Sequence, residues 1–87
     1  MTILVTGGLG YIGSHTVVEL LQNNFQVIIV DDLSNSEKFI LDNIEKVAGK
    51  RPVFFPFDLK RKELLSQVFD AYQIDGCINF AAYKAVK

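Results

Sequence analysis

Four short apolar runs alternate along this chain with longer segments of helical periodicity. The runs cover residues 3–6, 27–31, 53–57 and 77–81, and their almost unbroken hydrophobicity is typical of strands that are covered on both faces. A helical segment between consecutive apolar runs is the pattern of βαβ units on a parallel sheet. The alternation therefore predicts an α/β fold with four parallel strands.

The order of these strands follows from the handedness of their connections. Right-handed crossovers give the order 3-2-1-4, with helices on both faces of the sheet. Pro56 lies in the third run and has no amide hydrogen, which suits the edge position that this order assigns to it. Eighty-seven residues suffice for one domain at most. Because this strand order is that of a Rossmann fold, we expect residues 1–87 to form part of one.

Three helices are expected between the strands. The first should run from Tyr11 to Asn23-Asn24, and the second should follow a capping box at Ser34-Asn35-Ser36-Glu37 and stop at Gly49. The third follows the basic run at residues 60–62, which we interpret as a solvated face. The expected inward stripes are Val17, Leu20 and Leu21 in the first helix; Ile40, Ile44, Val47 and Ala48 in the second; and Leu64, Leu65, Val68, Phe69 and Tyr72 in the third.

The composition argues against several classes of function. Nine Lys and Arg against ten Asp and Glu give a net charge of -1, so binding to nucleic acid or to an anionic membrane is not expected. No apolar run reaches the roughly 18 residues that span a bilayer, and no Cys/His cluster has the spacing of a metal site. The single Cys77 is expected to be a buried residue that packs as a small apolar side chain. A lone cysteine cannot form a disulfide within the chain, which fits a reducing compartment, and we expect a cytoplasmic protein.

A glycine-rich turn, Thr6-Gly7-Gly8-Leu9-Gly10-Tyr11-Ile12-Gly13, joins the first strand to the first helix. Gly8, Gly10 and Gly13 fit the dinucleotide-binding pattern G-x-G-x-x-G, and Gly7, Gly10 and Gly13 fit a G-x-x-G-x-x-G variant. In either register Gly10 allows a pyrophosphate to approach the backbone and Gly13 allows the helix to pack closely. The amides of Tyr11 and Ile12 should then bind phosphate oxygens.

Acidic residues follow the second and third strands. Asp31-Asp32 stand where a carboxylate accepts hydrogen bonds from the adenosine ribose and repels a 2′-phosphate, which favours NAD over NADP; the alternative is a turn before the Ser34 cap. Asp58 could meet the adenine amino group or cap the third helix. Phe80-Ala81-Ala82 should lie at the topological switch point, followed by Lys84 as a donor to ribose or phosphate.

These segments together, residues 6–15, 31–36, 58–59 and 80–86, resemble the UDP-glucose 4-epimerase family of extended short-chain dehydrogenases/reductases, collinearly over the whole chain. The resemblance implies that Tyr11 and Ile12 contact the pyrophosphate of NAD. It also implies three further groups of contacts: to the ribose from Asp31, Asp32, Leu33, Ser34, Asn35 and Ser36; to the adenine from Asp58 and Leu59; and to the nicotinamide half from Phe80, Ala81, Ala82, Tyr83 and Lys84. The family commonly has His at the position of Asn79, so the hydrogen bonds available there differ.

The activity implied by the resemblance is the interconversion of UDP-glucose and UDP-galactose through a transient 4-keto sugar, in a homodimeric enzyme that binds a UDP-sugar and holds NAD tightly. The family's catalytic Ser or Thr and Tyr-x-x-x-Lys pair correspond to positions beyond Lys87, so no catalytic residue and no independent activity are expected in these 87 residues. Tyr83 to Lys87 spell Tyr-x-x-x-Lys, but their place directly after the fourth strand favours cofactor contacts. The alternatives are another nucleotide-sugar epimerase or dehydratase, or a non-catalytic NAD-binding fragment.

Overall fold

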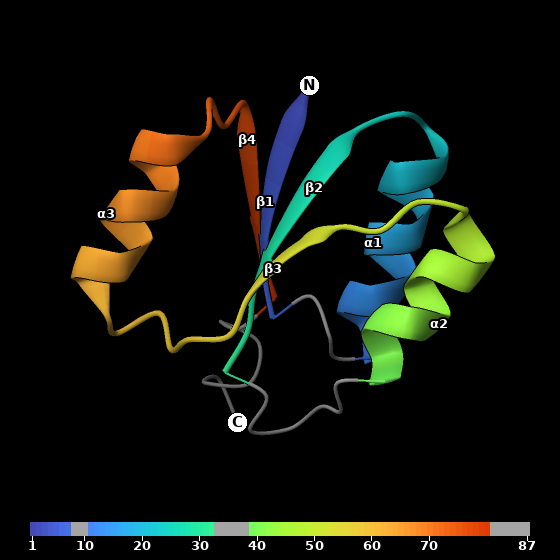
Figure 1. The fold of residues 1–87 in the computed structure, drawn as a ribbon, viewed down its shortest axis with the longest axis horizontal. Helices are drawn as coiled ribbons and strands as arrows, with labels where there is room; N and C mark the ends of the chain where they lie inside the picture. The colour runs from blue at the N-terminus through green and yellow to red at the C-terminus, as the bar shows by residue number, and fades with distance from the viewer. Residues whose placement is uncertain (8–10, 33–38, 81–87) are drawn as a thin grey trace.

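A computed structural model describes residues 1–7, 11–32 and 39–80 of the chain (Figure 1). Strands and helices alternate along it, as the apolar runs predict. The elements are β1 (Thr2–Thr6), α1 (Tyr11–Gln22), β2 (Gln26–Val30), α2 (Phe39–Ala48), β3 (Val53–Phe55), α3 (Lys62–Ala71) and β4 (Gly76–Asn79).

The four strands form one parallel sheet in the order β3-β2-β1-β4, which confirms the predicted topology. Thr6 is paired with Val30 on one side and with Asn79 on the other, and Val30 is paired with Phe55. The four strands therefore end level with one another. Figure 1 shows α1 and α2 on one face of the sheet and α3 on the other.

Two apolar clusters, one on each face, hold the layers together. The central strands β1 and β2 contribute most of the fully buried side chains because they have a neighbouring strand on both sides and helices above and below. Between α1, α2 and the sheet the buried residues are Val5, Val17, Leu21, Val27, Ile29, Leu41 and Ile44. Between α3 and the sheet they are Leu4, Ile28, Val30 and Val68.

Three strands end earlier than expected. β3 ends at Phe55 rather than at residue 57, because Pro56 cannot donate a hydrogen bond to a neighbouring strand. β2 ends at Val30 rather than at Asp31, and β4 ends at Asn79 rather than at Ala81, which lies outside the described residues. The prediction that the Pro56 strand occupies an edge of the sheet is confirmed.

The inward stripe of α2 is confirmed at Ile44, which is buried, and at Ile40 and Ala48, which are partly buried against the same cluster, but it is wrong at Val47. Leu41 is buried together with Ile44, whereas Val47 is 65% exposed. Successive residues turn by about 100° around a helix, so Leu41 and Val47 lie on opposite sides of Ile44. Leu41 is buried at 2% exposure whereas Val47 is exposed, so α2 faces the core with the side that carries Leu41. The expected stop at Gly49 is confirmed by its φ of 77°, whereas the capping box at residues 34–37 lies outside the described residues.

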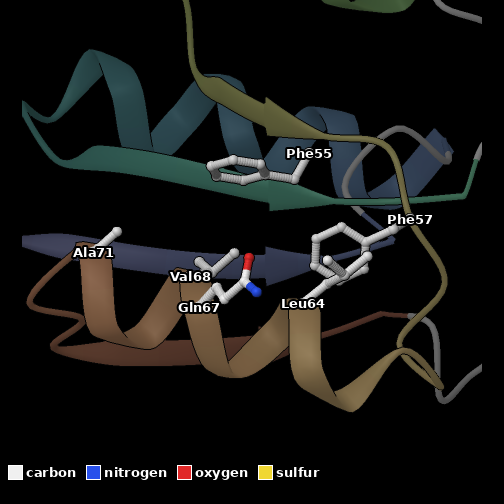
Figure 2. Close-up of a pocket in the computed structure, with 6 residues that line it drawn as sticks. All are labelled: Phe55, Phe57, Leu64, Gln67, Val68 and Ala71. Atoms are coloured by element: carbon white, nitrogen blue, oxygen red, sulfur yellow. The ribbon is translucent and has the colours of Figure 1, made fainter.

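The α3 side of the sheet is less completely covered than the other side. Val68 is buried, but Phe69, which was expected in the core, is 48% exposed because it lies at the margin of the apolar stripe. Cys77 is exposed, not buried as expected, since α3 packs over β1, β2 and β3. Between β3 and α3 lies an apolar hollow of about 270 Å³, lined by Phe55, Phe57, Leu64, Gln67, Val68 and Ala71 (Figure 2).

Candidate functional site

The candidate site lies where the four parallel strands end, which we call the carboxyl edge of the sheet. Gly7 follows β1, Asp31 follows β2, Phe80 follows β4, and Asp58 comes three residues after β3. Ligands of open α/β sheets bind outside the carboxyl ends of the strands. In Figure 1 these ends lie together with the beginning of α1.

Gly7 turns the chain sharply at the end of β1. Its φ is 75°, a left-handed conformation that favours glycine, and its N–H donates a hydrogen bond of 2.9 Å to the carbonyl oxygen of Val30. This observation favours the register in which Gly7, Gly10 and Gly13 form the motif. Gly8 and Gly10 lie outside the described residues, and Gly13 is buried within α1.

The first turn of α1 lies at the same edge. Tyr11 and Ile12 are the first two residues of the helix, and amides in a first turn have no carbonyl partner within their own helix. The first turn carries no acidic residue that would repel an anion. The partial positive charge at this end of α1 therefore favours a phosphate group.

Asp31 lies beside Gly7 because Thr6 and Val30, the residues before them, are paired. Asp31 is only 5% exposed, and its N–H donates a hydrogen bond of 3.3 Å to the carbonyl oxygen of Phe55. Asp32 is exposed. The structure thus brings the glycine turn and the first of the two predicted acidic residues together, while the predicted contacts Leu33, Ser34, Asn35 and Ser36 lie outside the described residues.

Asp58 stabilises the turn that leads into α3. Its Oδ1 accepts a hydrogen bond of 2.9 Å from the N–H of Lys60, and its carbonyl oxygen accepts one of 2.9 Å from the N–H of Arg61. These bonds form a local turn before the helix. Arg61 is the N-cap residue of α3 and no side chain caps the helix there, so the expected alternative of a helix cap at Asp58 is not found, and Asp58 itself is exposed. The side chain of Leu59 packs in the apolar cluster under α3.

A side-chain hydrogen bond that sequence reasoning missed joins the ends of β1 and β4. The Thr6 hydroxyl donates to Oδ1 of Asn79 at 2.6 Å, and the N–H of Phe80 donates to the carbonyl oxygen of Thr6 at 2.8 Å. Asn79, where the resemblance leads us to expect His, therefore accepts a hydrogen bond, and Phe80 is held beside Gly7. Thr6 could have been noticed as a polar residue that closes an apolar strand. Ala81, Ala82, Tyr83 and Lys84 lie outside the described residues.

No group of three or more His, Cys, Asp and Glu side chains in residues 1–7, 11–32 and 39–80 could hold a metal ion. None of the helices described is long and apolar enough to cross a membrane.

Comparison with known proteins identifies relatives that match almost the whole chain. The bifunctional protein gal10 of Schizosaccharomyces pombe is 54% identical over 97% of this chain and 12% of its own length. The UDP-glucose 4-epimerase of Erwinia amylovora is 50% identical over 99% of this chain and 26% of its own length. These matches confirm the resemblance to UDP-glucose 4-epimerases.

Solved structures of UDP-glucose 4-epimerases also match this chain. The UDP-glucose 4-epimerase of Stenotrophomonas maltophila, crystallised with bound NAD and formylated UDP-arabinopyranose, matches with a TM-score of 0.89 and 40% identity over 92% of this chain and 24% of that one. The 87 residues thus span about a quarter or less of the length of these relatives. The family model described as GDP-mannose 4,6 dehydratase matches residues 4–87, and the chain therefore belongs to that family.

Proposed function

We propose that residues 1–87 form the N-terminal, NAD-binding part of a UDP-glucose 4-epimerase. The observation that carries this proposal is the position of Asp31 beside the left-handed turn at Gly7, at the carboxyl edge of the sheet. The identity of 50% to the epimerase of Erwinia amylovora supports the choice of enzyme. NAD is supported by its presence in the structure of the epimerase from Stenotrophomonas maltophila.

The residues at the carboxyl edge fit the parts of NAD in order. The turn at Gly7, with Gly10 and Gly13, and the amides of Tyr11 and Ile12 would hold the pyrophosphate. The ribose would be bound by Asp31 and its successors Asp32, Leu33, Ser34, Asn35 and Ser36, the adenine by Asp58 and Leu59, and the nicotinamide half by Phe80, Ala81, Ala82, Tyr83 and Lys84. The order of the strands, β3-β2-β1-β4, follows the order of these groups along the cofactor.

These residues bind and orient; they do not transfer protons. When bound, NAD supplies a hydride acceptor for the sugar C4 and later returns the hydride. A carboxylate at Asp31 accepts hydrogen bonds from a ribose diol and repels a 2′-phosphate, which favours NAD over NADP. The Thr6–Asn79 hydrogen bond fixes the strand end from which the nicotinamide contacts begin. The acid/base groups, the UDP-sugar site and the homodimer contacts belong to the remainder of a longer enzyme, which we place in cytoplasmic galactose metabolism.

Calorimetric titration with NAD and NADP tests the cofactor proposal. We expect the chain to bind NAD more tightly than NADP, and Asp31→Asn to weaken NAD binding by about tenfold or more, since a hydrogen bond to a charged group contributes about 1.5–3 kcal/mol. Asp42→Asn is the matched control, because Asp42 lies on the exposed surface of α2. Equal binding of NADP by the unchanged chain, or an Asp31 variant that is folded by circular dichroism and binds NAD normally, would contradict the proposal.

A graft tests the choice of enzyme. Residues 1–87 would replace the matching first quarter of the Erwinia amylovora epimerase, and the interconversion of UDP-galactose and UDP-glucose would be assayed. We expect an active epimerase. The family description favours one alternative, a 4,6-dehydratase. The same graft into a GDP-mannose 4,6-dehydratase is therefore the comparison, and activity of that graft alone would support the dehydratase.

A further inference from the structure

We draw no further inference here: the strongest candidate, the apolar hollow between β3 and α3 that Figure 2 shows with Phe57, Leu64 and Gln67 at its wall, carries nothing because no feature of the described residues indicates what would cover it.

Discussion

Gly49 follows α2 in a left-handed conformation, and there is open space where a side chain would lie. Its φ is 77°, its N–H donates to the carbonyl oxygen of Glu45 at 2.8 Å, and a Cβ added there would meet no atom within 4 Å. The cost of a side chain at this position is therefore conformational only. We expect Gly49→Ala to lower the free energy of unfolding by about 1–2 kcal/mol, measured by urea denaturation.

Gly76→Ala is the control for this prediction. The φ of Gly76 lies outside the left-handed region, and an added Cβ would lie 3.2 Å from Cδ1 of Ile3, the movable end of a side chain. We expect a smaller loss than for Gly49→Ala, because the end of the Ile3 side chain can move aside. An equal loss in both variants would contradict the prediction that the left-handed backbone at Gly49 determines the cost.

The thiol of Cys77 combines exposure with a raised pKa. The residue is exposed on β4, yet partial desolvation raises the pKa of the thiol above its ordinary value of 9.0. A raised pKa means less thiolate at any given pH, and the thiolate is the nucleophile. At pH 8 we therefore expect iodoacetamide to alkylate the folded chain more slowly than a short peptide with the sequence of residues 74–80. The rate for the folded chain should continue to rise at a pH where that of the peptide has levelled off, and identical pH profiles would contradict the prediction.

Among the elements, α2 shows most clearly what periodicity can and cannot predict. The pattern predicts an amphipathic helix that stops at Gly49, and both features are found. Leu41 and Val47 flank Ile44 on the helix surface, and the sequence of α2 is compatible with burying either of them. Leu41 is the residue that is buried, because it packs with residues of α1 and the sheet. Such tertiary contacts cannot be predicted from the periodicity of one helix.

This difference gives a prediction for α2. Leu41→Ala should lower the free energy of unfolding by about 2–4 kcal/mol, because Leu41 is 2% exposed and its removal leaves a cavity between α2 and the sheet. Val47→Ala, in the same helix, should change it by less than about 0.5 kcal/mol, because Val47 is exposed. Urea denaturation of both variants measures the two values. A larger loss for Val47→Ala than for Leu41→Ala would mean that α2 packs through the stripe predicted from the sequence.

In the strands and the candidate site, too, some features could be predicted from the sequence and others depend on tertiary contacts. Strand order and direction depend on handedness and on the short, almost unbroken apolar runs, so they could be predicted, as could the place of Asp31 at the carboxyl end of β2, although the strand itself ends one residue earlier than expected. The sequence offered two roles for Asp58, and its hydrogen bond from Lys60 shows that it orders the turn before α3 without capping that helix. The exposure of Cys77 depends on how far α3 extends over the sheet, and the Thr6–Asn79 bond depends on the register of β1 and β4. Both are tertiary features that neighbouring residues in the sequence do not specify.

At the scale of the whole molecule, the two faces of the sheet are unequally covered. Among the residues that the structure describes, α1 and α2 pack on one face and α3 alone packs on the other, where Cys77 is exposed and Phe69 is half-exposed. A chain of this size buries only about 60–65% of the surface that it exposes when unfolded. We therefore expect a small free energy of unfolding for these 87 residues, which a bound cofactor or partner would raise.

The open side of β4 gives a prediction for the isolated chain. Within the described part of the chain β4 pairs only with β1, and its residues, Gly76-Cys77-Ile78-Asn79, include no charge and no proline to protect a strand edge. We expect the chain to self-associate between about 10 µM and about 1 mM, detected as a rising mean mass in sedimentation velocity. Cys77→Lys should reduce this association because it places a charge on the edge strand. Ser66→Lys, which adds the same charge on the exposed surface of α3, should leave it unchanged. A monomer at every concentration, or an equal effect of both lysines, would show that β4 is not the associating edge.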